Sequence, residues 1–136
     1  MRGRPTVADS MPTPIAVVGA DEFEGRRLRR DGVWAVAFAA DWCPFCRAFL
    51  PRFAELGIRH PQLLIADLTD EDSPLWDRFD IQVVPTVLVF VDGQPQDRFD
   101  GLGGVGLTQE AVDAIAAALD RRGLRRGPPH PAGRGR

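Results

Sequence analysis

The sequence predicts an α/β protein with a central mixed sheet of about four to five strands, flanked by helices on both faces. Strand-like apolar runs alternate with segments of helical periodicity along the chain, which is the order expected when parallel strands are joined by helices. One apolar run, 32–40, has no polar alternation, which indicates a strand covered on both faces. The pattern ends on two runs joined by an Asp-Gly turn, which predicts an antiparallel hairpin.

The predicted domain begins with a strand, a helix and a second strand. The apolar run PIAVV predicts the first strand at 14–18. The segment 21–32 has Phe23 and Leu28 as its apolar positions and ends at a glycine, so we expect a modest helix there. The run GVWAVAFAA at 32–40 is the predicted central strand.

A second helix is predicted over 44–56, directly after the central strand. Its apolar residues follow helical spacing: Phe45, Ala48, Phe49, Phe53 and Leu56. Gly57 supplies a stop signal after them. Pro51 lies inside the helix, where its missing N–H should kink the axis.

A strand, a short helix and a hairpin follow. The run QLLIADL at 62–68 predicts the strand, and the acidic segment 70–80 predicts a short helix. We expect this helix to turn its large apolar residues inward: Leu75, Trp76 and Phe79. The hairpin consists of 84–91, a tight turn, and the polar run 95–101, whose Pro95 suits an edge strand.

A final helix is predicted over 108–122, with Thr108 as its cap. Its expected apolar face consists of Ala111, Ile115, Ala116 and Leu119. The sequence thus predicts one domain at 14–122, which is an ordinary length for a single hydrophobic core. Residues 1–13 and 123–136 are rich in Gly, Pro and Arg and carry no periodicity, so we expect disordered tails there.

Composition and charge argue against several classes of function. No apolar run is long enough to span a bilayer, and the N-terminus lacks the apolar region of a secretory signal. The arginines of the C-terminal tail have no aromatic residues among them, so we interpret the tail as solvated rather than as a nucleic-acid site. We expect a cytoplasmic monomer with no membrane partner.

The segment DWCPFCR at 41–47 contains both cysteines of the chain. Cys43 follows the predicted central strand and Pro44 suits the first position of a helix, so Cys43 falls at the N-cap. Free N–H groups and the helix dipole favour a thiolate there, which predicts a reactive nucleophile. Cys46 lies one helical turn on, close enough to close a disulfide with Cys43 and to act as the resolving thiol.

Two other interpretations of the cysteines, a zinc site and a pair of inert core thiols, fit the sequence less well. Zinc needs four ligands, and beyond the cysteines the chain offers only His60 and His130, so no metal site is expected. Two inert buried cysteines are the usual case in a core. A junction between strand and helix, with Trp42 before the pair and Pro44 inside it, is a poor match for that case.

Over about residues 14–122 the chain resembles the thioredoxin family. The matching pieces, in order, are WCPFC at 42–46, the helix proline Pro51, VVPT at 83–86 and Gly101. The resemblance implies the thioredoxin fold, a cis Pro85 facing the cysteines, and a Val84 backbone that pairs with an extended substrate. It also implies an apolar rim around Cys43 formed by Trp42, Pro44, Phe45, Val84 and Gly101.

Two departures from the family pattern concern the chemistry. Ala37 stands where the family often has a buried Asp that moves the proton of the resolving thiol, and the chain has no lysine. Asp41 or a water would then carry that proton, and we expect a slower resolving step. The CPFC pair resembles the Cys-Pro-aromatic-Cys of glutaredoxins, which implies a less reducing potential than in typical thioredoxins.

The resemblance implies a thiol-disulfide oxidoreductase that acts on protein disulfides through Cys43 and Cys46, without a bound cofactor. Its electrons would come from a reductase or a low-molecular-weight thiol. One alternative is a glutaredoxin-like enzyme that uses a small thiol, although GLGGVG at 101–106 lacks the acidic pair expected after a glutathione-binding glycine pair. The other alternative is a non-catalytic interaction module that uses the same rim.

Overall fold

The computed structural model describes residues 15–126. Its elements, in chain order, are β1 (Ala16–Val18), the 3₁₀ turn η2 (Ala20–Glu22), β2 (Phe23–Glu24), β3 (Arg27–Leu28), β4 (Val33–Ala39), α1 (Pro44–Glu55), the 3₁₀ turn η3 (Leu56–Ile58), β5 (Leu63–Asp67), α2 (Leu75–Arg78), β6 (Thr86–Val91), β7 (Gln94–Asp100) and α3 (Gln109–Arg126). This order confirms the α/β class.

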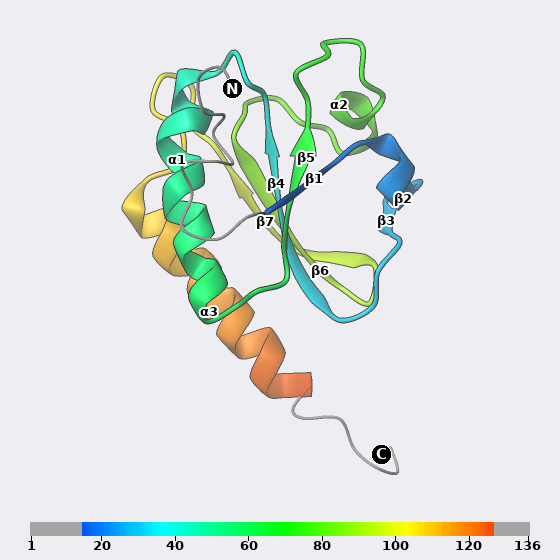
Figure 1. Cartoon of the computed structure of the whole chain (residues 1–136), viewed down its shortest axis with the longest axis vertical. Helices are drawn as coiled ribbons and strands as arrows, with labels where there is room; N and C mark the ends of the chain where they lie inside the picture. Colours follow the sequence, from blue (N-terminus) through cyan, green and yellow to red (C-terminus); the bar gives the residue numbers. More distant parts are fainter. Residues whose placement is uncertain (1–14, 127–136) are drawn as a thin grey trace, which may run out of the picture.

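Five strands form one mixed sheet, in the order β1-β5-β4-β6-β7. β5 pairs in parallel with β1 and β4, while β6 pairs antiparallel with β4 and β7. Figure 1 shows α1 and α3 on one face of the sheet, with α2 and the β2–β3 hairpin on the other. The predicted mixed sheet with helices on both faces is therefore confirmed.

The central strand β4 is buried from Ala35 to Ala39, as the continuous apolar run predicted. Side chains alternate between the two faces of a strand. Phe38 contacts Phe23 and Phe79 on the α2 face, so the alanines of β4 point toward α1 and α3. These small side chains allow α1 to pack close to the sheet.

Four phenylalanines form the core on the α2 face: Phe23, Phe38, Phe79 and Phe90. The Phe79 ring lies at its centre, with centroid distances of 5.0 Å to Phe23, 5.1 Å to Phe38 and 6.0 Å to Phe90. Tilted and edge-on pairs at such distances add to the stabilisation from burial. This cluster joins the β2–β3 hairpin to the sheet.

The predicted helix at 21–32 is wrong. This segment contains η2 and then the antiparallel pair β2–β3, in which Phe23 lies opposite Leu28. Residues five apart would point to different sides of a helix, whereas in this hairpin both side chains enter the core. Gly25, with a φ of +60°, occupies the turn between the two strands, where glycine adopts the left-handed conformation without steric penalty.

Two helix boundaries also differ from the prediction. α1 ends at Glu55 and continues as η3 through Gly57 rather than stopping at that glycine. α3 continues beyond residue 122 to Arg126, into the segment predicted as a disordered tail. The tail predicted at 1–13 and the remainder of the C-terminal tail, 127–136, lie outside the described residues.

The face that α3 buries differs in part from the expected one. Its buried residues are Val112, Ile115, Ala118 and Leu119. Thr108 acts as the predicted cap, because its Oγ1 accepts a hydrogen bond from the Ala111 N–H at 3.2 Å. Near its other end, Arg122 donates two hydrogen bonds to the Asp97 carboxylate, at 3.0 and 3.1 Å. α3 is thus attached to the edge strand β7.

The predicted hairpin β6–β7 turns at Asp92 and Gly93, which both have positive φ, 50° and 91°. This is the backbone of a two-residue turn that matches the twist of the strands. The Gly93 carbonyl accepts a hydrogen bond from the Leu28 N–H at 2.9 Å. A Cβ at Gly93 would lie 2.7 Å from the Leu28 carbonyl oxygen, so this turn packs closely on β3.

No helix within the described residues combines the length and the apolar character needed to cross a bilayer.

Replacing Phe79 by alanine should lower the free energy of unfolding by about 3–5 kcal/mol, because it leaves a cavity among three other rings. Urea unfolding followed by circular dichroism measures the change. Ile58→Ala is the control: Ile58 is 76% exposed, so its truncation should change stability by less than about 0.5 kcal/mol. Equal losses in the two variants would contradict the role assigned to the aromatic cluster.

Candidate active site

Cys43 is the N-cap residue of α1, as the sequence predicted. Its Sγ accepts a hydrogen bond from the Cys46 N–H at 3.2 Å, and Pro44 occupies the first turn. The Cys43 N–H donates to the Ala40 carbonyl, which closes the tight turn between β4 and the helix. The thiol therefore lies at the positive end of the helix dipole, where negative charge is stabilised.

The two sulfurs are free thiols in different environments. Cys46 is fully buried, whereas Cys43 lies in the wall of a surface groove. Burial raises the pKa of the Cys46 thiol well above its ordinary range, and its hydrogen bond to Cys43 adds to this effect. Cys43 is itself only 4% exposed and borders the groove, with Cys46 behind it. The attacking role of Cys43 and the resolving role of Cys46 stay predictions.

The segment before β6 lies across from Cys43. The Cys43 thiol donates to the Val84 carbonyl at 3.5 Å. The peptide bond between Val84 and Pro85 is cis. Gly101 backs this loop, because a Cβ at Gly101 would lie 2.4 Å from the Pro85 carbonyl oxygen. The structure therefore brings together three separate segments of the sequence, which contain Cys43, Val84 with Pro85, and Gly101.

A groove of about 300 Å³ passes Cys43. The residues that line it are Trp42, Cys43, Pro44, Phe45, Trp76, Gln82, Val83, Val84 and Gly104. Trp42, Pro44, Phe45 and Val84, which were predicted to form the apolar rim, are among these residues. Pro85 and Gly101 are buried behind the groove instead. None of these lining residues, among those the structure describes, carries a charged side chain.

Trp76 is a residue of the groove that the sequence analysis assigned to the core. Its ring stacks on Trp42, with centroids 6.4 Å apart and planes inclined by 9°. Each indole N–H donates to a backbone carbonyl, from Trp42 to Thr69 at 3.0 Å and from Trp76 to Asp70 at 3.2 Å. Trp76 is partly buried and packs against the core, as expected, but it also borders the groove. Its position next to the fully buried Leu75 indicates that it cannot share the same inward direction.

The segment GLGGVG at 101–106 forms a small hairpin beside the groove. Leu102 and Gly106 exchange two backbone hydrogen bonds, of 3.0 and 2.8 Å. Gly106 has a φ of +81°, and a Cβ there would lie 2.8 Å from the Cβ of Phe45. The hairpin therefore packs directly against the first turn of α1.

Arg98 holds the loop after α2 onto the edge strand. Its guanidinium donates to the carbonyls of Phe79 and Asp80, at 2.7 and 2.6 Å, and to the Asp100 carboxylate. Asp80 has a φ of 52°, so this backbone is sharply turned where Arg98 binds it. An arginine in a polar strand offers no sequence signal for this contact.

Ala37 occupies the position where the family often has a buried acid. Ala37 is fully buried, on the α1 face of β4. Burial is the largest effect on the pKa of Cys46 and raises it, the Cys43 thiol raises this pKa further, and the Arg47 guanidinium lowers it. Asp41 is exposed, and its backbone binds Thr69 and Arg47. The proposed role of Asp41 or a water as carrier of the Cys46 proton stays a prediction.

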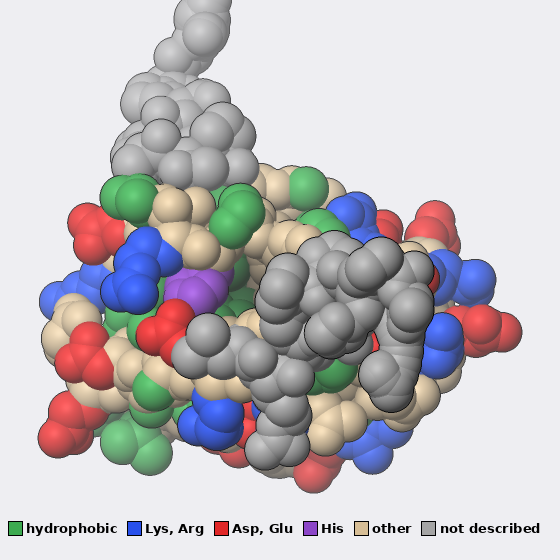
Figure 2. Space-filling model, turned by 90° about the horizontal axis from the view of Figure 1, so that it is seen from below, with side chains coloured by type: hydrophobic (Ala, Val, Ile, Leu, Met, Phe, Trp, Pro, Cys, Tyr) green, Lys and Arg blue, Asp and Glu red, His purple; other side chains and the backbone are tan. Residues whose placement is uncertain are grey.

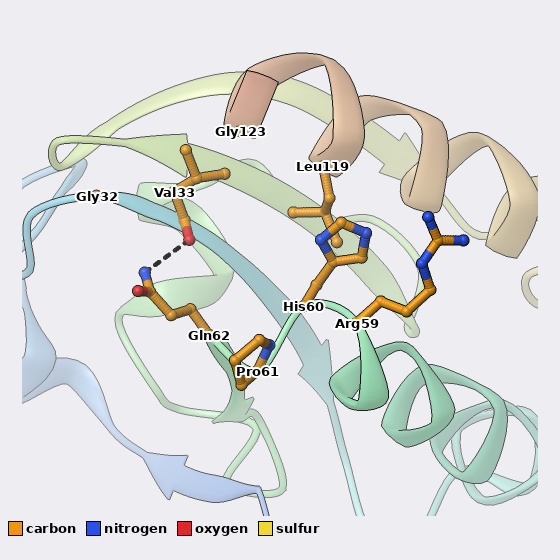
Figure 3. Close-up of a pocket in the computed structure, with 8 residues that line it drawn as sticks. All are labelled: Gly32, Val33, Arg59, His60, Pro61, Gln62, Leu119 and Gly123. Atoms are coloured by element: carbon orange, nitrogen blue, oxygen red, sulfur yellow. Dashed lines mark hydrogen bonds between the residues drawn. The ribbon is translucent and has the colours of Figure 1, made fainter. Parts of the chain in front are cut away.

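A second hollow, of about 280 Å³, lies at the opposite end of the sheet. It is lined by Gly32, Val33, Arg59, His60, Pro61, Gln62, Leu119 and Gly123 (Figure 3). His60 pairs with Asp120 at 2.9 Å and Gln62 donates to the Val33 carbonyl. Figure 2 shows acidic and basic side chains interspersed over this end. The His60–Asp120 pair thus joins the segment before β5 to α3, and the Gln62 hydrogen bond joins the same segment to β4.

Within residues 15–126, no group of three or more His, Cys, Asp or Glu side chains is placed to hold a metal ion.

A dithiol at the start of a helix, opposite a cis-proline loop on a mixed sheet, defines the class of thioredoxin-fold proteins. The sequence agrees with this class. Residues 14–114 match the Thioredoxin family, and the chain belongs to that family.

The chain matches nearly the whole length of some relatives but only about a third of others. The chain is 34% identical to thioredoxin from Staphylococcus aureus over 110 residues, which is 79% of this chain and 98% of that protein. It is 31% identical to glutaredoxin-3 from Mus musculus over 115 residues, which is 81% of this chain. The match spans only 34% of that longer relative.

The structure of mitochondrial thioredoxin 3 from Saccharomyces cerevisiae, in its oxidised form, superposes with a TM-score of 0.60 at 20% identity. This match covers 77% of the present chain and 95% of the yeast chain. The similarity confirms the predicted thioredoxin fold.

Gly101→Ala should destabilise the protein by about 1–3 kcal/mol, because the new methyl group overlaps the Pro85 carbonyl and overpacks the loop. Gly103→Ala is a matched control, since a Cβ at Gly103 meets nothing within 4 Å. Thermal unfolding of both variants measures the difference. If the two melt together, the close approach of Gly101 to Pro85 does not constrain this loop.

The buried Cys46 predicts a pH dependence of stability for the reduced protein. Above about pH 8.5 an ordinary thiol ionises, so the unfolded chain loses a proton that folded Cys46 retains. The free energy of unfolding should then fall by up to about 1.4 kcal/mol per pH unit as the pH rises. Urea unfolding of the wild type and Cys46→Ala, under reducing conditions at several pH values, measures both slopes. Equal slopes would contradict the raised pKa of Cys46.

Proposed function

We propose that this protein reduces or exchanges disulfides in other proteins through Cys43 and Cys46. The single observation that supports the proposal best is the asymmetry of the pair. Cys43 lines an uncharged groove at a helix N-terminus, and Cys46 lies buried behind it with a raised pKa. One sulfur is placed to attack, and the other is kept protonated until the first has reacted.

In the first step, the Cys43 thiolate attacks one sulfur of a substrate disulfide. A bond forms between Cys43 and that sulfur, and the other substrate sulfur leaves as a thiolate that takes up a proton. In the second step, Cys46 loses its proton and attacks the Cys43 sulfur. This releases the remaining substrate thiolate and leaves a disulfide between Cys43 and Cys46. The substrate gains two electrons, and the protein loses them.

The oxidised pair must then recover two electrons from a reductase or a low-molecular-weight thiol. We propose that the protein works as a cytoplasmic monomer, because two cysteines that serve as a reversible pair suit a reducing compartment. The proline and aromatic residue between the cysteines support a potential less reducing than that of typical thioredoxins. The resolving step should be slow, since Ala37 supplies no acid near Cys46.

A glutaredoxin-like activity is the second candidate, favoured by the CPFC motif and by the match to glutaredoxin-3. It would use a small thiol such as glutathione as the electron donor. The described residues that line the groove offer no charged side chain for the carboxylates of glutathione, which supports the first candidate. Recharging the oxidised protein with glutathione, and separately with a thioredoxin reductase and NADPH, distinguishes the two.

Cys46→Ser should trap substrates, because the mixed disulfide on Cys43 then has no resolving thiol. Proteins captured from a cell extract should be released by a reducing agent and visible on non-reducing gels. Cys43→Ser is the control and should capture nothing, while its rate of insulin reduction should fall by about two orders of magnitude or more. If Cys46→Ser captures nothing and the wild type leaves insulin disulfides intact, the proposed function is wrong.

A further inference from the structure

One side of the groove is formed by a single stretch of chain, residues 76–84, which we call the 76–84 wall. Four residues of this stretch line the groove: Trp76, Gln82, Val83 and Val84. The Ile81 N–H donates to the Trp76 carbonyl at 2.8 Å, which ties the two ends of the wall together. Its last residue contacts the reactive sulfur, because the Val84 carbonyl accepts a hydrogen bond from the Cys43 thiol. The position of this wall therefore decides the space beside Cys43.

Part of the wall has a hollow rather than packed side chains next to it. Another hollow, of about 440 Å³, is lined by Asp80, Gln82, Val83, Arg98, Asp100 and Gly101. Gln82 and Val83 thus border both this hollow and the groove. Gln82 is exposed and Val83 is only partly buried. A segment with few packed neighbours opens more readily than the core, so this part of the wall needs another support.

Arg98, on β7, supplies that support from the side of the sheet. Its guanidinium donates to the carbonyls of Phe79 and Asp80, at 2.7 and 2.6 Å. These two residues lie in the middle of the wall, where α2 has ended, and carbonyls at a helix C-terminus lack partners within the helix and favour a positive charge. The Nε of Arg98 also donates to both oxygens of the Asp100 carboxylate, at 2.9 and 3.1 Å. The planar guanidinium thus binds three groups at once and joins the wall to β7.

The exposure of Arg98 indicates that it holds the wall rather than the fold. Its side chain is 30% exposed and does not belong to the hydrophobic core. The Asp80 carbonyl that it binds is also exposed. Water could therefore take the place of the guanidinium as a donor, and the domain would remain folded. Water would not tie the wall to the sheet, so the wall would become mobile next to Cys43.

We propose that Arg98 is a positioning residue for disulfide exchange, which holds the 76–84 wall at the distance from Cys43 that a polypeptide disulfide requires. Arg98 acts through the wall, since it does not line the groove itself. This inference rests on the proposed function, because it needs Cys43 to attack a disulfide. It adds a residue on the edge strand, outside the cysteine motif and the 83–86 segment, that the reaction depends on.

The test compares a polypeptide disulfide with a small one. The reduced protein is mixed with an excess of insulin or of 2-hydroxyethyl disulfide, and alkylation of its remaining thiols over time gives the second-order rate constant of its oxidation. No reductase is needed. Arg98→Met keeps the aliphatic stem but removes the donors. It should lower the rate constant for insulin about tenfold, because insulin must lie against the wall, and that for the small disulfide less than about twofold.

Two further variants separate positioning from a general loss of stability. Arg98→Lys keeps the positive charge but not the planar fork, and should restore the ratio of the two rate constants to within about threefold of the wild type. Arg122→Met is the matched control, because Arg122 also donates two hydrogen bonds to a carboxylate of β7, that of Asp97, but holds α3 instead of the wall. Its ratio should equal that of the wild type. The ratio is insensitive to the fraction of folded protein.

Hydrogen exchange measures the wall directly, without any substrate. Mass spectrometry of peptides covering 79–84 should show faster amide exchange in Arg98→Met than in the wild type, and no change in Arg122→Met. Unchanged exchange in Arg98→Met would overturn the proposal.

The kinetic outcomes separate this proposal from the proposed function. If Arg98→Met keeps the wild-type ratio, or if Arg122→Met lowers the ratio equally, Arg98 has no positioning role, while disulfide reduction by the wild type still stands. If the wild type is oxidised by neither insulin nor 2-hydroxyethyl disulfide, the proposed function fails and the positioning role fails with it.

Discussion

The hydrogen bond from the Cys46 N–H to the Cys43 sulfur is the interaction on which the site depends. It makes Cys43 the cap of α1 and places it at the dipole end, in contact with the groove. A short turn, closed by the hydrogen bond from the Cys43 N–H to the Ala40 carbonyl, connects this cap to the end of the buried strand β4. Because β4 pairs with strands on both sides, the position of this helix terminus is set by the middle of the sheet. The reactive sulfur is thus fixed by the best-packed part of the protein.

Much of this arrangement could be predicted from the sequence because its signals are local. The apolar run of β4, the proline after Cys43 and the Asp-Gly turn each determine nearby backbone. The helix expected around Phe23 and Leu28 was wrong because the local signals there do not distinguish a helix from a hairpin. Their apolar character was clear, but the choice between helix and hairpin depends on packing against Phe79 and Phe90, which come much later in the chain.

The residues missed at the site depend on contacts between distant segments. Trp76 belongs to the groove because Trp42 lies beside it, and Arg98 matters because two carbonyls of the loop after α2 point at it. Gly106 lies in a glycine-rich loop, and only its close approach to Phe45 shows that a larger residue would not fit there. In each case the contact is with a residue in a distant segment, so no pattern within the segment of Trp76, Arg98 or Gly106 indicates it.

The start of α1 and the end of α3 lie at opposite ends of the molecule (Figure 1). The attachment of Arg122 to Asp97 keeps the last turns of α3 along the sheet and away from the groove. A second domain, a surface linker or an affinity handle joined after α3 would therefore leave the approach to Cys43 open. A fusion made after α3 would therefore lie at the end of the molecule opposite to Cys43.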